Sequence, residues 1–180
     1  MYKFLLKRKL NSFYKNYSRG RCFQNLRNIQ KILVLFDTAD YDEADTFIEK
    51  LGKLGKDVTV YAYKDKLDRY DYSETPYHIV TTKDANDLFD NKMDDIVKEL
   101  KETEFHLVID LTIKRNIALE YVLAHANALL KAGLKKNDFP QYDLSITSLP
   151  ETESAALKVR ELGKQIVYYL HTINSSIFDS

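Results

Sequence analysis

Residues that could bind a small ligand follow two apolar segments of the chain. Asp37 and Thr38 come directly after the apolar run 32–36, and Asp110 and Thr112 stand at the end of a second apolar run. In open parallel α/β sheets, ligands bind beyond the carboxyl ends of the strands, where the strand order reverses. If both runs are strands, these carboxylates and hydroxyls lie at the edge where ligands bind. The same residue types also cap helices and complete turns, so a purely structural role is the alternative for each.

A possible anion site follows the second apolar run. Lys114 and Arg115 stand between that run and a predicted helix. Backbone N–H groups at a helix start, together with two cationic side chains, can hold a phosphate or a carboxylate. A solvated turn is the alternative. An enzyme that acts on a small phosphorylated or carboxylated metabolite would have Asp37, Asp110, Lys114 and Arg115 around its cleft.

The turn after the first apolar run lacks the glycines of a nucleotide site. A Rossmann dinucleotide site requires G-x-G-x-x-G directly after its first strand, because only glycine allows the tight turn and the close approach of the pyrophosphate. Residues 37–43 read DTADYDE, without glycine and with four acids. The G-x-x-x-x-G-K-[ST] motif of P-loop proteins does not occur either. We therefore expect no NAD, FAD or P-loop nucleotide, and no other cofactor.

The histidines and the single cysteine show neither a metal-binding nor a nucleophilic pattern. None of the four histidines lies three or four residues from another histidine or from Cys22, so the spacing typical of zinc ligands is missing. The G-x-S-x-G motif of serine hydrolases is missing as well. One cysteine forms no internal disulfide, which favours a reducing compartment. We expect no metal site and identify no catalytic residue.

Positive and negative charges are segregated along the chain. The 180 residues contain 27 Lys+Arg and 27 Asp+Glu, but nine of the cations precede Asp37, which is the first acid. The balanced total therefore conceals a basic segment followed by an acidic one. A binding partner encounters the electrostatic field of each segment separately. No apolar run approaches the roughly 20 residues needed to cross a bilayer.

The basic segment has the pattern of an amphipathic helix. Apolar and aromatic side chains recur at spacings of three and four between Tyr2 and Tyr17 and share one side. We define residues 1–28 as the basic arm and predict a single domain over 29–180. The arm residues expected to contact a partner through charge are Lys7, Arg8, Lys9, Lys15, Arg19 and Arg21. Those expected to make apolar contacts are Leu6, Leu10 and Phe13.

The basic arm can act in three ways. It can lie on an anionic membrane surface, where each Lys or Arg contributes about 1 kcal/mol and the apolar side adds burial. It can bind RNA or DNA phosphates, with Tyr and Phe available for stacking. It can also pack on the protein's own acidic body or on a second copy. The sequence leaves these interpretations open.

The rest of the chain alternates between strand and helix patterns. Apolar, β-branched and aromatic runs predict strands at 32–36, 58–63, 77–82, 105–111, 129–134 and 144–146. Helical spacing predicts helices over 44–54, 93–100 and 117–127, and a long one that begins at Pro150. A continuous helix through Lys131 is the alternative to the strand at 129–134. This order predicts an α/β protein: a three-layer Rossmann-like or flavodoxin-like sandwich with a mostly parallel sheet, preceded by a basic amphipathic helix.

Two stretches of the body resemble known families. FHLVIDLT at 105–112, followed by LEYVLAHA at 119–126 and LKAGL at 130–134, is similar to a family of short bacterial α/β proteins of unknown function. Those proteins also begin with a Lys-rich arm and end in a long helix, so the resemblance implies the fold and a bacterial origin but no activity. The same order faintly resembles the N-terminal half of heptosyltransferase-like glycosyltransferases. Their early Gly-Asp turn is replaced here by 37–43, and their nucleotide-sugar domain has no counterpart, which implies a lone half without catalysis.

These observations favour a binding or accessory module without enzymatic activity. We expect a cytoplasmic protein that its basic arm tethers to an anionic membrane surface, at the inner face of the cytoplasmic membrane, or to an acidic protein partner. One alternative is a degenerate glycosyltransferase-like enzyme that acts on a small phosphorylated or carboxylated metabolite. A second alternative is an RNA-binding accessory protein. The sequence identifies no particular small-molecule ligand.

Overall fold

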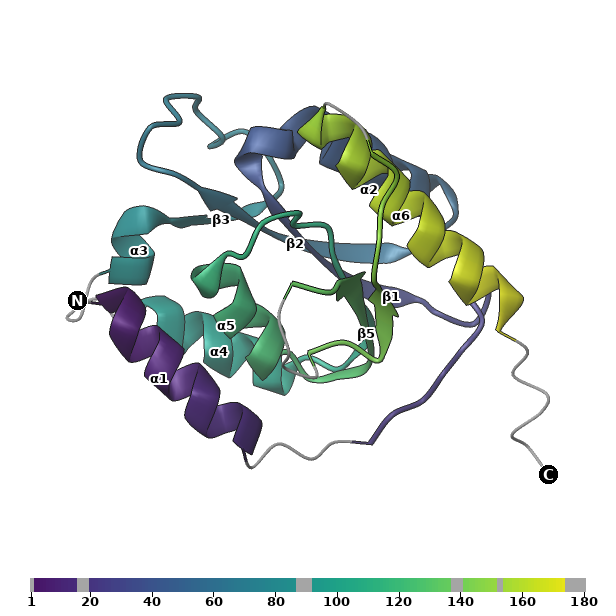
Figure 1. The fold of residues 1–180 in the computed structure, drawn as a ribbon, viewed down its shortest axis with the longest axis horizontal. Helices are drawn as coiled ribbons and strands as arrows, with labels where there is room; N and C mark the ends of the chain where they lie inside the picture. Colours follow the sequence, from purple (N-terminus) through teal and green to yellow (C-terminus); the bar gives the residue numbers. More distant parts are fainter. Residues whose placement is uncertain (1, 16–19, 87–91, 137–140, 152–153, 174–180) are drawn as a thin grey trace.

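The sheet of this protein has the strand order β3-β2-β1-β4-β5-β6, and all of its pairings are parallel (Figure 1). The computed structural model describes residues 2–15, 20–86, 92–136, 141–151 and 154–173. Its strands are β1 (Lys31–Asp37), β2 (Asp57–Lys64), β3 (His78–Thr81), β4 (Phe105–Asp110), β5 (Ala128–Leu134) and β6 (Leu144–Ile146). This is the strand order typical of Rossmann folds, and it reverses between β1 and β4. The predicted strands are confirmed.

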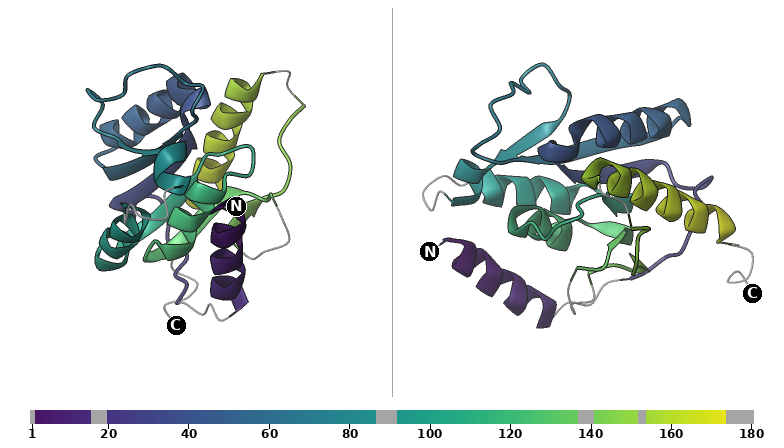
Figure 2. Two further views of the ribbon diagram at one scale, coloured as in Figure 1. Left: turned by 90° about the vertical axis from the view of Figure 1, so that its left-hand side faces the viewer. Right: turned by 45° about the horizontal axis from the view of Figure 1, so that its top comes forward.

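Helices cover both faces of the sheet. They are α1 (Tyr2–Lys15), α2 (Tyr41–Lys53), α3 (Thr82–Asn86), α4 (Lys92–Glu102), α5 (Ile117–His125) and α6 (Ala155–Thr172), with a short 3₁₀ turn η1 (Thr38–Asp40) before α2. Figures 1 and 2 show α2 and α6 on one side of the sheet and α1, α4 and α5 on the other. The predicted three-layer α/β sandwich with an N-terminal helix is therefore confirmed. None of the helices in the described ranges is apolar and long enough to cross a bilayer.

The central strand β1 is apolar throughout because helices bury both of its faces. Leu33 and Leu35 pack into the core on the α4 and α5 side. Ile32, Val34 and Phe36 pack into the core under α2 and α6. All five side chains are fully buried. A strand that is buried on both faces is expected to be continuously apolar instead of alternating.

Asp37, the last residue of β1, caps the turn that leads into helix α2. The Asp37 carboxylate accepts a hydrogen bond from the N–H of Ala39, which caps η1. Asp40 is the N-cap residue of α2, but its side chain makes no capping hydrogen bond. At the other end, Gly55 has a φ of 74°, the left-handed conformation that glycine adopts after a helix. Gly55 thus follows the end of α2, close to the predicted end of this helix at residue 54.

The structure confirms the predicted strand at 129–134 over its helical alternative, and it corrects the predicted start of one helix. Lys131 lies in β5, paired with Val108 of β4, and not in a continuation of α5. Its ammonium is buried and donates to the carbonyl oxygens at the end of α5, including that of Leu123 at 2.6 Å, where the helix dipole favours a cation. Helix α6 does not begin at Pro150. Ser154, in an extended conformation, is its N-cap residue.

Candidate functional site

The reversal of strand order brings the predicted ligand residues to one edge of the sheet. Asp110 is the register partner of Leu35 in β1, so the carboxyl ends of β1 and β4 lie side by side. Asp37 ends β1, and Asn116, the N-cap residue of α5, reaches across from the β4 side. The Asn116 amide lies 3.4 Å from Oδ2 of Asp37. This contact spans the point where Rossmann-like proteins bind their ligands.

The β1 side of this edge is acidic. Burial raises the pKa of Asp37, and the neighbouring Asp65 and Asp68 raise it further, against the hydrogen bonds from Ala39 and Asn116. Burial and Asp37 also raise the pKa of Asp40, while Lys114 lowers it. A phosphate or carboxylate at the end of β1 would therefore meet like charges, which agrees with the missing nucleotide motif.

Thr38 anchors the loop that follows β2. Its hydroxyl donates to Oδ2 of Asp68 at 2.6 Å, and the phenol of Tyr72 donates to the same oxygen at 2.9 Å. The hydrogen bond from Thr38 is the main cause that lowers the pKa of Asp68. Thr38 thus holds the 65–77 loop in place. This is the structural role that the sequence left open as the alternative to ligand binding.

Asp110 is a buried carboxylate whose hydrogen-bonding capacity is used within the protein. Oδ1 accepts from the N–H and the hydroxyl of Thr112, at 2.9 and 2.6 Å. Oδ2 accepts from Lys136 at 2.7 Å and from the phenol of Tyr142 at 2.6 Å. Burial raises the pKa of Asp110, but Lys136 and the hydrogen bonds outweigh it and hold the pKa below its usual value. Four donors match the about four lone-pair sites of a carboxylate, so the predicted ligand residues Asp110 and Thr112 bind each other and their neighbours.

Two partners of Asp110 were not found from the sequence. Lys136 follows β5, and its side chain is 6% exposed. Tyr142 precedes β6, and its ring lies over Gly133, where an added Cβ would stand 2.5 Å from a ring carbon. A glycine inside a strand can mark such a close approach, which is the only sequence signal for this contact.

At the predicted anion site, Arg115 and Lys114 face different acidic residues of the protein. The Nε of Arg115 lies 2.9 Å from Oε2 of Glu120, a residue of α5 that is 3% exposed. The amide of Gln141 donates to the other oxygen of Glu120, and the buried Oε1 atom of Gln141 has no hydrogen-bond partner among the residues that the structure describes. Lys114 is exposed and lies near Asp40. The two cations therefore do not converge on a common point.

The basic arm folds against the body through its apolar side. Leu10 of α1 is 1% exposed and belongs to the core cluster that includes α4 and α5. Phe13 packs against the same cluster, with its ring centroid 4.7 Å from that of His125 in α5. Lys7, Arg8 and Lys9 are exposed. The structure thus places the predicted apolar anchors Leu10 and Phe13 against the protein's own body and leaves the three cations outside.

The remaining arm predictions divide into two groups. The Nε of Arg21 lies 3.1 Å from the carboxylate of Asp143, whose side chain is 3% exposed, so Arg21 forms an ion pair with the body. The side chains of Leu6 and Lys15, and all of Arg19, lie outside the described residues. Leu26 is buried in the core under α6. The segment defined as the basic arm therefore contributes a residue to the hydrophobic core.

Metal ligands do not cluster in the described part of the chain. No group of three or more His, Cys, Asp or Glu side chains there could hold a metal ion. Cys22 is exposed, and its sulfur accepts from the amide of Gln24. The edge of the sheet consequently presents internal ion pairs and hydrogen bonds instead of a set of convergent ligands.

Fold and site together define a Rossmann-like α/β protein whose sheet edge is acidic at β1 and internally paired at β4. The chain belongs to a family of unknown function (DUF6913), whose model matches residues 3–173. This confirms the predicted resemblance to such a family. The comparisons found no match among the curated proteins and none among the solved structures. The resemblance to heptosyltransferase-like glycosyltransferases has no support from them.

Proposed function

We propose that this protein is a binding or accessory module that attaches to an acidic protein through the outer side of α1. The observation that supports this proposal is the orientation of the helix. Its consecutive cations Lys7, Arg8 and Lys9 are exposed, while Leu10 and Phe13 pack on the body. A folded core holds the positive charges in place, so binding does not require the helix to order first.

An acidic protein fits this surface better than a membrane or RNA. Membrane binding by an amphipathic helix needs its apolar side in the lipid, and here Leu10 is buried in the protein. Binding of single-stranded RNA gains much of its energy from bases stacked on aromatic side chains, and Phe13 packs on His125 instead. The exposed side of α1 therefore offers a partner its positive charge and not its apolar side chains. Charge complementarity between two proteins sets their rate of association and their choice of partner.

The polar edge of the sheet supports a role without catalysis. Asp110 is saturated by Lys136, Thr112 and Tyr142. Arg115 is paired with Glu120. A catalytic acid or base needs free hydrogen-bonding capacity toward a substrate. The hydrogen-bonding groups of Asp110 and Arg115 are already engaged by other residues of the protein.

The test compares three anionic probes on one charge-reversed variant. Lys7→Glu, Arg8→Glu and Lys9→Glu are combined in the full chain, and binding is measured to poly-L-glutamate, to phosphatidylglycerol vesicles and to poly(U). A matched control reverses Lys53, Lys66 and Arg69, which are exposed outside α1. Circular dichroism of both variants checks that the fold is retained. We expect the unmodified chain and the control to bind poly-L-glutamate and the α1 variant to lose most of that binding.

Three results would overturn the proposal. Equal loss in both variants would mean that net charge, and not the α1 surface, determines binding. Binding to vesicles without binding to poly-L-glutamate would restore the membrane interpretation. Binding to poly(U) alone would favour the RNA interpretation.

A further inference from the structure

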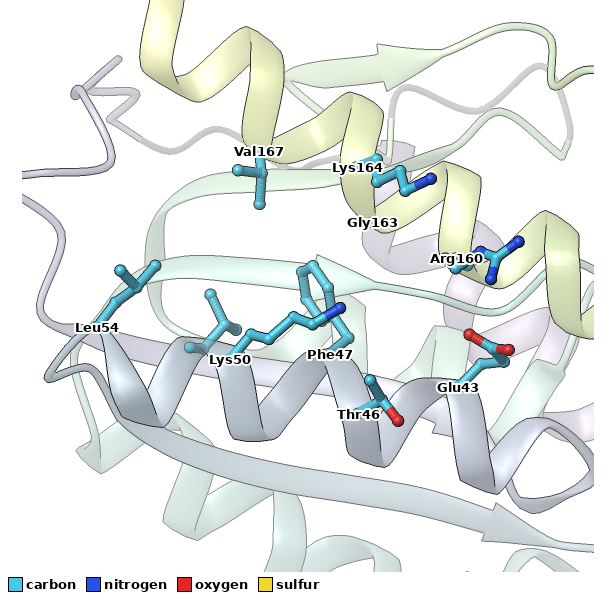
Figure 3. A pocket seen from close by; sticks show the side chains of 10 residues that line it. Glu43, Thr46, Phe47, Lys50, Leu54, Arg160, Gly163, Lys164 and Val167 are labelled. Atoms are coloured by element: carbon cyan, nitrogen blue, oxygen red, sulfur yellow. The ribbon is translucent and has the colours of Figure 1, made fainter.

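A groove lies between α2 and α6, on the side of the sheet opposite α1 (Figure 3). It encloses a cavity of about 230 Å³. Its apolar lining includes Phe47 and Leu54 from the α2 side and Val167 from α6. Leu54 is 59% exposed. The groove therefore offers apolar surface that the protein itself leaves uncovered.

Gly163 shapes the floor of this groove. An added Cβ at Gly163 would stand 2.8 Å from two ring atoms of Phe47, so the ring lies directly on the backbone of α6. The ring of Phe47 thus reaches from α2 to the backbone of α6. A larger residue at 163 would push Phe47 outward into the space that is now open.

The rim of the groove is mainly cationic. Lys50, Arg160 and Lys164 line it, with Glu43 as the acid among the lining residues. Lys164 also forms an exposed ion pair with Glu161 at 2.7 Å, a contact that water weakens. Figure 3 shows Glu43 and Arg160 at one end, Leu54 and Val167 at the other, and the two lysines between them. One end of the groove is thus apolar, and positive charge begins halfway along it.

We propose that this groove binds a medium-chain fatty acid that carries a free carboxylate. The alkyl chain would lie on Phe47 with its end toward Leu54 and Val167, and the carboxylate would lie between Lys50 and Lys164. The cavity of about 230 Å³ is larger than the apolar cavity of about 150 Å³ that accepts benzene, so it can hold a part of the alkyl chain. The proposal is independent of the acidic-partner surface, which lies on the opposite side of the sheet.

The first experiment separates the effect of the ligand's chain length on affinity from the effect of its charge. Isothermal titration of the full chain with hexanoate, octanoate, decanoate and decanol, below their aggregation concentrations, gives four dissociation constants. Each added methylene that enters the groove should lower the Kd up to about fourfold, which corresponds to about 0.8 kcal/mol. Decanol should bind more weakly than decanoate because it lacks the charge that the lysines attract.

Matched variants locate the site. Leu54→Ser removes the apolar end of the groove, and Leu67→Ser makes the same change at a residue that is 79% exposed in the 65–77 loop. Both positions are on the surface, so both variants should fold. Decanoate binding should weaken severalfold in Leu54→Ser and stay unchanged in Leu67→Ser. The double variant Lys50→Gln with Lys164→Gln should reduce decanoate affinity to that of decanol and leave decanol affinity unchanged.

The opposite results are equally clear. Absence of measurable decanoate binding would overturn the proposal, as would equal affinities in Leu54→Ser and Leu67→Ser. If an acidic amphipathic peptide bound the groove and decanoate did not, the occupant would be a protein helix and the fatty-acid assignment would be wrong.

Discussion

The Nζ of Lys136 lies 2.7 Å from Oδ2 of Asp110, and their side chains are only 6% and 2% exposed. This pair joins the end of β4 to the residues after β5, beside the point where the strand order reverses. Two hydrogen bonds from Thr112 and one from Tyr142 complete the surroundings of the carboxylate. Residues that would be candidates for ligand binding in another Rossmann-like protein thus hold two neighbouring strands together here.

Removing the cation of this pair should destabilise the protein strongly. Lys136→Met leaves the buried Asp110 charge without its counter-ion, and breaking a buried pair by removing one partner costs about 3–5 kcal/mol. Urea denaturation at pH 7 measures this change. The double variant with Asp110→Asn should recover much of the loss, because no unpaired charge remains. If Lys136→Met alone cost less than 1 kcal/mol, water would have to reach Asp110 and the pair would not be buried in solution.

The same pair predicts an acid-sensitive contribution to stability. The pKa of Asp110 is held below its ordinary value of 3.8 in the folded protein. Between the lower folded value and 3.8, the unfolded chain binds more protons, so stability falls as the pH falls through this range. Urea midpoints between pH 2 and 5 should therefore depend less steeply on pH in Asp110→Asn than in the unmodified chain. An identical slope would assign the acid sensitivity to other carboxylates, such as Asp84 beside Lys92.

Gly133 should be essential to the position of Tyr142. In Gly133→Ala the new Cβ would lie 2.5 Å from a carbon of the Tyr142 ring, so the ring must shift and disturb the hydrogen bond of its phenol to Asp110. Such overpacking typically costs about 1–3 kcal/mol. The control is Gly52→Ala, whose Cβ meets nothing within 4 Å and which should be neutral or stabilising by up to about 1 kcal/mol. Equal effects in the two variants would contradict the contact between Gly133 and Tyr142.

Asp37 should show the opposite pH dependence to Asp110. Burial raises its pKa above 3.8, so the folded protein binds more protons than the unfolded chain in the range between the two values. Its ionised form therefore costs stability once the pH rises above that range. Asp37→Asn should stabilise the protein at pH 7, by less than about 1 kcal/mol as for other partly exposed charges, and the gain should vanish near pH 3. Thermal denaturation at both pH values checks this, and a loss of stability at pH 7 would show that Asp37 is needed as an anionic cap.

The sequence predicts features that are local or periodic, and it misses those that depend on distant partners. The strands were predictable because an apolar run such as 32–36 can only be buried on both faces. The edge location of Asp37 and Asp110 followed from the rule for parallel sheets. Lys136 and Tyr142 were missed because they stand 26 and 32 residues from Asp110, and no local pattern reports such contacts. Periodicity also showed that α1 is amphipathic, but not that its own body covers Leu10.

The docking of α1 can be followed through His125. Burial lowers the pKa of this histidine below 6.5, and Lys101, Lys131 and Lys9 lower it further, against a hydrogen bond with the carbonyl of Tyr121. The ring of Phe13 covers His125 with a centroid distance of 4.7 Å. Phe13→Ala should admit water to the imidazole and raise its pKa toward 6.5, as measured by an NMR titration of the His125 ring protons.

Stability should change in step with this pKa. Because the folded protein binds fewer protons than the unfolded chain just below pH 6.5, stability falls as the pH falls through this range. Phe13→Ala should weaken that dependence, whereas Phe23→Ala, at an arm residue that is 41% exposed, should leave it unchanged. If His125 titrated at 6.5 in the unmodified chain, α1 would not cover it in solution. The helix would then be free to turn its apolar side outward, and the proposal of attachment by charge alone would lose its structural basis.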